Sequence, residues 1–117
     1  MSYVTGFLTP VKIKDKDRYI KSAEAAWPLF KGYGCLEHVE TWGEDVPDGV
    51  NTSFPMAVKK QDDEVVVFSW LRWPDRKTAD EAWAKMMEDP AMKDMDMPFD
   101  GKRMMWGGFA TVFEDRA

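Results

Sequence analysis

A histidine and a glutamate lie two residues apart in a segment whose pattern predicts a β-strand. Side chains alternate along a strand, so His38 and Glu40 share one face, about 6–7 Å apart along the backbone. An imidazole beside a carboxylate is an acid–base pair that can move a proton near neutral pH. We therefore take Glu40 as the candidate catalytic base and His38 as its assisting group. The alternative is a pair at a solvated sheet edge or in a hydrogen bond between subunits.

Further candidate side chains lie near the ends of the predicted strands and in the loops between them. Arg103 could hold a substrate carboxylate with two parallel hydrogen bonds, or it could pair with Glu40 or Asp45 and hold a loop. Asp45 begins a turn-rich stretch in which an aspartate often bonds its own backbone. Three tryptophans could line a flat aromatic cavity, although core packing explains them as well. The candidate substrate-binding residues are Trp42, Asp45, Trp70, Asp100, Arg103 and Trp106.

The sequence predicts no metal site and no cofactor. It contains one histidine and one cysteine, which excludes zinc or iron sites built from several such residues. Seven of the nine methionines fall between Met86 and Met105. The spacing of Met92, Met95 and Met97 would suit a soft metal such as Cu(I), but methionine also fills irregular gaps in cores, and we favour packing.

Charge and hydropathy narrow the class of protein. The chain has 117 residues and a net charge of -5, so it lacks the basic field that nucleic-acid binding needs. Its longest apolar run, Val65–Leu71, is far shorter than the ~20 residues of a membrane helix. The first residues do not read as a secretory signal, and Cys35 has no disulfide partner. We expect a cytoplasmic protein that binds neither nucleic acid nor membrane, with Cys35 as a buried, inert thiol.

The elements that must position these residues follow from periodicity. Alternation predicts strands, and apolar residues at three- and four-residue steps predict helices. Gly34 should end the first helix, Pro28 should bend it, and Asp75 should cap the second. Phe54–Lys59 is expected to be extended, and Asp89 to about Met95 to form a short helical turn. The predicted strands are Tyr3–Ile13, Cys35–Trp42, Val65–Trp73 and Lys102–Glu114, and the predicted helices are Asp15–Tyr33 and Asp75–Met87.

This β-α-β-β-α-β order predicts one α+β domain over residues 1–117, with the ferredoxin-like plan. Two helices cover only one face of the antiparallel sheet. The strands Val65–Trp73 and Lys102–Glu114 are nevertheless apolar on both faces. An exposed apolar sheet face indicates an interface, and a homodimer packed sheet to sheet is the simplest way to cover it.

Several stretches of the chain resemble one family. They are VETWGEDVPDG (39–49), AVK (57–59), VVFSW (66–70), KMMEDPAMK (85–93) and MPFDGKRM with GGF (97–104 and 107–109). The family is the uncharacterised YbaA-like group of bacterial proteins, within the dimeric α/β-barrel superfamily. The resemblance runs from about Tyr3 to Phe113, includes Glu40 and Trp42 but not His38, and implies a sheet-to-sheet dimer of ferredoxin-like protomers. It implies no activity.

Together these features predict a homodimer with an apolar, aromatic cavity for a small molecule. As an enzyme it would catalyse proton transfer or a cofactor-independent oxidation, with Glu40 as base, His38 assisting, Arg103 holding an anion and Trp42 as a cavity wall. The alternative is a structural or regulatory homodimer without catalysis, whose aromatic face is used up by the interface.

Overall fold

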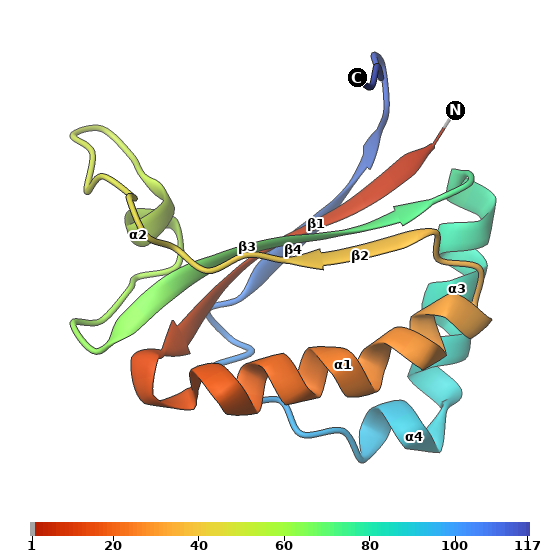
Figure 1. Ribbon diagram of the computed structural model, residues 1–117, viewed down its shortest axis with the longest axis horizontal. Coiled ribbons are helices and arrows are strands. Elements are labelled where there is room, and N and C mark those ends of the chain that lie inside the picture. The colour runs from red at the N-terminus through yellow and green to blue at the C-terminus, as the bar shows by residue number, and fades with distance from the viewer. Residues whose placement is uncertain (1) are drawn as a thin grey trace.

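The computed structural model describes residues 2–117, in which four strands form one antiparallel sheet of order β2-β3-β1-β4 (Figure 1). The strands are β1 (Tyr3–Lys12), β2 (Glu37–Glu40), β3 (Glu64–Trp73) and β4 (Met105–Ala110). The helices are η1 (Ile13–Asp15), α1 (Lys16–Gly32), α2 (Phe54–Ala57), α3 (Arg76–Glu88) and α4 (Pro90–Lys93). The element order and the sheet confirm the predicted α+β, ferredoxin-like protomer.

The two faces of the sheet have different surroundings. The helices α1, α3 and α4 lie against one face, whereas the short α2 lies on the other side, over one end of the sheet (Figure 1). We call the first the helix face and the second the open face. The register pairs Leu8 with Phe68 on one side and with Met105 on the other, so these three residues form a row across the open face.

The open face is apolar and largely uncovered. Phe68, in the central strand β3, remains 48% exposed although Phe54 of α2 packs against it with ring centroids 6.1 Å apart. Met105 and Phe109 of β4 are exposed as well. Exposing such a row of apolar side chains to water is unfavourable, so the open face has the composition of a surface that is normally covered by a partner.

The buried residues on the helix face form two clusters instead of one continuous core. The first surrounds Trp73, which is almost fully buried and donates its indole N–H to Thr5 Oγ1 at 3.0 Å. The second contains Val11, Tyr19 and Val67. The helices are thus anchored at both ends of the sheet, and the space between the two clusters is where the candidate site lies.

The ends of the two long helices follow the predicted signals. Gly34, directly after the C-cap residue Tyr33 of α1, has a positive φ of 102°, and Asp75 accepts a hydrogen bond from the backbone N–H of Thr78 at the start of α3. Pro28 is accommodated inside α1, which continues to Gly32. Among residues 2–117, no helix is long and apolar enough to cross a membrane.

Three predicted elements differ from the structure. Residues Phe54–Ala57 form a helix instead of an extended segment, because Ser53 caps it through the N–H of Met56 and Pro55 occupies its first turn. Regular pairing of β2 is limited to Glu37–Glu40, flanked by isolated backbone bonds. The last strand is shorter than predicted at both ends, since the residues before Met105 form a turn held by Asp100 and the strand ends at Ala110 instead of Glu114.

Candidate functional site

A cavity of about 230 Å³ lies between the helix face and the layer formed by α1, α3 and the segment before β4. Its walls come from both buried clusters, and most of its lining is apolar. Five of the lining side chains are methionines, which are flexible and polarizable. The apolar lining includes Phe7, Phe30, Leu71, Trp73, Trp83, Met86, Met92, Met95, Met97, Phe99 and Met104.

The cavity exists because small residues occupy the helix positions that face the sheet. Ser22, Ala23 and Ala26 of α1 point at it, and Ala79 of α3 does the same from the opposite side. Side chains of this size cannot fill the distance between a helix and a sheet, so space remains where larger residues would make a solid core.

A chain of three polar side chains forms part of the cavity wall. The Tyr19 hydroxyl lies 2.6 Å from Glu40 Oε1, and His38 Nε2 lies 2.7 Å from Glu40 Oε2. The imidazole packs against Phe30, with ring centroids 5.2 Å apart, and against Trp27. The side chain of His38 is 7% exposed and that of Glu40 is 26% exposed. Each oxygen of the Glu40 carboxylate therefore lies within hydrogen-bond distance of one side chain, Tyr19 or His38. These two contacts hold the carboxylate in one orientation.

The surroundings of Tyr19 determine the direction of its hydrogen bond. Burial raises the pKa of the Tyr19 hydroxyl far above its ordinary value, and the negative charge of Glu40 raises it further. The hydroxyl consequently keeps its proton and donates it to Glu40 Oε1. Tyr19 thus acts on the carboxylate as a hydrogen-bond donor.

The pair of His38 and Glu40 is reachable from two sides. Both residues line the internal cavity, and both also line a shallow groove on the outer surface between α1 and the edge strand β2. Ile20, Trp27 and Leu36 contribute apolar side chains to that groove. A proton taken up at Glu40 therefore has a short way to solvent.

A methionine-rich strap closes the side of the cavity opposite the sheet. We use this name for residues 89–99, which contribute Met92, Met95, Met97 and Phe99 to the lining. Asp96 in the strap pairs with Arg18 of α1 through two contacts of 2.6 Å, and Asp89 accepts a hydrogen bond from Tyr33. The methionines that the sequence analysis assigned to packing are thus the wall of a cavity.

The predicted substrate-binding residues do not gather in this cavity. Trp42 packs beside the Val11 cluster with Lys16 over its ring, 5.4 Å from the centroid, and Asp45 lies in the loop after β2. Trp70 is on the open face, where its indole N–H donates to Glu37 Oε1 at 2.9 Å. Trp106 stacks on Trp83 at a centroid distance of 4.8 Å.

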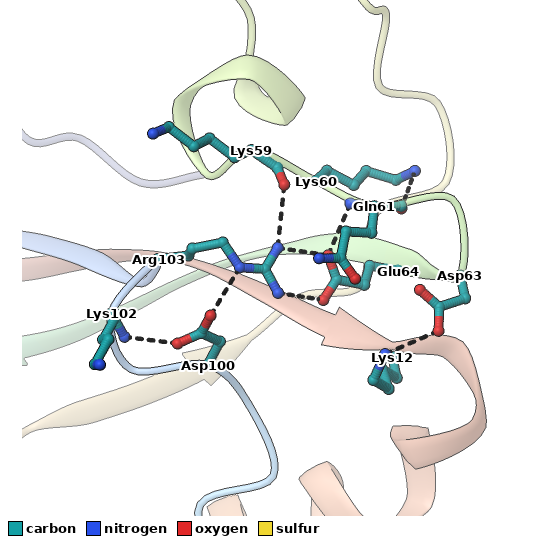
Figure 2. Close-up of polar contacts among 9 residues, drawn as sticks. All are labelled: Lys12, Lys59, Lys60, Gln61, Asp63, Glu64, Asp100, Lys102 and Arg103. Carbon is teal, nitrogen blue, oxygen red and sulfur yellow. Dashed lines mark hydrogen bonds and ion pairs between the residues drawn. The ribbon is translucent and has the colours of Figure 1, made fainter.

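Arg103 and Asp100 belong to an ion-pair network (Figure 2), and neither of them lines the cavity. The Arg103 guanidinium binds Glu64 at 2.6 and 2.7 Å, Asp100 at 2.9 Å and the Lys59 carbonyl at 3.1 Å. The bond from Arg103 holds the pKa of Glu64 below its ordinary value. Four donor contacts are engaged in this way, so Arg103 ties the α2 region and the turn before β4 to β3. This corrects the expectation that it pairs with Glu40 or Asp45.

The sequence places His38 and Glu40 on one face of a strand but leaves open which side of the sheet that face occupies. The register places them opposite Leu71 and Ser69, on the helix face. Tyr19 was not predicted, because only the packing of α1 on the sheet brings it to Glu40. Within residues 2–117, no group of three or more histidine, cysteine or acidic side chains is placed to hold a metal ion.

Comparisons with known proteins agree with this fold and name a family. The solved structure of a dimeric ferredoxin-like protein from an uncultured marine organism matches 98% of this chain and 100% of its own with a TM-score of 0.62 and 14% identity. The "Uncharacterized protein YbaA" of Escherichia coli (strain K12) and that of Shigella flexneri are each 50% identical to this chain over 117 residues, which cover 98% of this chain and all of theirs. A sequence profile described as "Protein of unknown function (DUF1428)" matches residues 2–101. The chain therefore belongs to the DUF1428 family, whose function is unknown.

Proposed function

We propose that the protein is a homodimer that binds a small, largely apolar molecule in the cavity of each protomer and transfers a proton to or from it. The observation that carries this proposal is the cavity of about 230 Å³ with the Tyr19–Glu40–His38 chain in its wall. Ligand sites are typically apolar hollows with a few converging polar groups, and this cavity has that composition. The buried Cys35 thiol suits the cytoplasm, which we propose as its location.

Glu40 is the proposed base in this reaction. A carboxylate accepts hydrogen bonds only, and Tyr19 and His38 use one position on each of its oxygens. The remaining lone pairs are free for a proton donor. His38 can then pass the proton to the outer groove, because its imidazole borders both spaces.

The open sheet face supports the homodimer. Its apolar row of Leu8, Phe68 and Met105 would be covered by the same row of a second copy related by a two-fold axis. The solved protein that shares the fold is described as dimeric, which is consistent with this arrangement. The cavity opens on the other side of the sheet, so the interface would leave it accessible.

Native mass spectrometry of the protein purified gently from its host tests the binding function. We expect two chains and a reproducible excess mass, and we expect Ala26→Leu to lose that excess. Ala26 lines the cavity, so the added side chain fills it and should raise the free energy of unfolding by about 0.5–1 kcal/mol. If the cavity is the binding site, the Ala26→Leu variant should therefore be more stable than the native protein and should carry no ligand.

Ala25→Leu is the matched control, because Ala25 is the neighbouring residue in α1 and faces solvent. It should keep the excess mass and change stability little. Retention of the excess by Ala26→Leu, or its loss from both variants, would place the ligand outside this cavity.

A further inference from the structure

We infer that the cavity selects uncharged ring compounds carrying a hydrogen-bond donor, such as a hydroxyl, and excludes carboxylates. This inference rests on the proposed function and adds the chemical class of its ligand. It follows from three features of the lining: its charge, its unused hydrogen-bonding capacity and its size.

The lining carries a negative charge with no free positive charge to oppose it. Its titratable residues are Tyr19, His38 and Glu40, and neither lysine nor arginine is among the residues described around the cavity. Among the described lining residues the one basic group is His38, whose Nε2 lies 2.7 Å from Glu40 Oε2, so any charge on the imidazole is paired. An anionic ligand would therefore be repelled by the Glu40 carboxylate with no cation in the described lining to compensate.

Two arginines in the surroundings of the cavity are engaged by other acidic groups. Arg18 forms its two contacts with Asp96 of the strap and is not among the residues that line the cavity. Arg103 is bound by Glu64 and Asp100 and does not line the cavity. Nothing in this arrangement offers the bidentate partner that a substrate carboxylate needs.

The polar wall needs a donor from the ligand. The Tyr19 hydroxyl already donates its one hydrogen bond to Glu40, and the carboxylate oxygens still have lone pairs without a partner. A ligand hydroxyl satisfies one of them and gains a hydrogen bond to a charged group. A ligand of the same shape without a donor leaves it unsatisfied.

The volume and the lining fit a ring compound. An apolar cavity of ~150 Å³ holds one benzene ring, so about 230 Å³ leaves room for two fused rings. Phe30, Trp73 and Trp83 provide aromatic walls, and the methionine-rich strap adapts to an irregular outline.

Three matched probes test the inference: 2-naphthol, 2-methylnaphthalene and 2-naphthoate. They share one ring system and differ in carrying a neutral donor, no donor or a negative charge. By equilibrium dialysis at neutral pH, 2-naphthol should bind the native protein about tenfold more tightly than 2-methylnaphthalene. Binding of 2-naphthoate should be weaker than that of both.

The variant Glu40→Gln tests whether the Glu40 carboxylate causes the selectivity among the three probes. It keeps the size of residue 40 and removes its charge, so the preference for 2-naphthol should shrink and the rejection of 2-naphthoate should relax. Glu37→Gln is the control, because Glu37 lies on the same strand but on the open face. It should preserve the order of the three affinities.

The outcomes separate the two levels of the proposal. Equal or tighter binding of 2-naphthoate, or equal binding of 2-naphthol and 2-methylnaphthalene, overturns the ligand class and leaves the cavity as a binding site. Binding that Ala26→Leu does not abolish, or binding of none of the three, overturns the cavity site together with the inference. The affinities of the native protein decide the class even if Glu40→Gln is poorly folded.

Discussion

Arg103→Ala should destabilise the protein strongly, because it leaves the Glu64 carboxylate without its counter-charge. Glu64 is 3% exposed, and Arg103 holds both of its oxygens. A buried carboxylate that loses its partner costs about 3–5 kcal/mol, of which the remaining bond from the Gln61 N–H offsets a part. Urea unfolding followed by circular dichroism should show a much lower midpoint.

Arg76→Ala provides the control for this substitution. Arg76 pairs with Asp80 at 3.5 Å on the surface of α3, where both side chains are exposed. Exposed pairs of this kind contribute little, so the midpoint should stay close to that of the native protein. Equal shifts in the two variants would contradict a structural role for the Arg103 network.

The ion pair between Arg103 and Glu64 also predicts how the stability of the protein depends on pH. Arg103 lowers the pKa of Glu64 in the folded protein below the ordinary value of 4.5, so the unfolded chain takes up a proton first as the pH falls. The pair therefore stabilises the protein above that value, and its contribution is lost as the pH falls through the lowered pKa. Arg103→Ala should lose less stability than the native protein between neutral pH and about pH 3, because this contribution is already missing.

The ion-pair network also explains the stretch MPFDGKRM at residues 97–104. Asp100 caps the turn through the Lys102 N–H and binds Arg103, which in turn reaches Glu64 and the Lys59 carbonyl (Figure 2). These contacts return the chain from the methionine-rich strap to the start of β4. The residues with the most distinctive pattern in the sequence thus serve the fold and hold the strap in place.

Much of the fold could be predicted because its signals are local. The alternation in β1 and β3, the glycine after α1 and the aspartate before α3 each depend on neighbouring residues, and the structure confirms them. The segment Phe54–Ala57 was predicted wrongly. Its aromatic and apolar residues suit a strand, but the hydrogen bond from the Met56 N–H to Ser53 starts a helix there.

The candidate site was predictable only in part. The strand period places His38 and Glu40 side by side, and the structure brings them within 2.7 Å. Which side of the sheet they occupy could not be predicted, because β2 carries polar residues on both faces. Glu37 on one face and Glu40 on the other make the two orientations of the strand equally compatible with the sequence pattern. Their face is determined by the pairing with β3, and the contact with Tyr19 by the packing of α1; both join residues distant in sequence.

A negative charge in the middle of the open face should dissociate the proposed homodimer. Phe68 lies in the central strand β3 and is 48% exposed, and within the protomer Phe68→Glu gives up its ring contacts with Phe54 and Trp70. In a two-fold interface each substitution occurs twice, and both copies bury a carboxylate against an apolar row. We expect the dissociation constant of the dimer to rise more than about 100-fold, measured by sedimentation equilibrium at micromolar concentrations.

Met87→Glu separates this effect from a general change in net charge. Met87 is 64% exposed on α3, in the helix layer on the other side of the sheet, so the variant should remain a dimer. Dissociation of both variants, or a native protein that is monomeric under these conditions, would contradict the interface. A monomeric Phe68→Glu variant that still binds its ligand would show that each cavity works within one protomer. That result is expected, since the open face and the Tyr19–Glu40–His38 chain lie on opposite sides of the sheet.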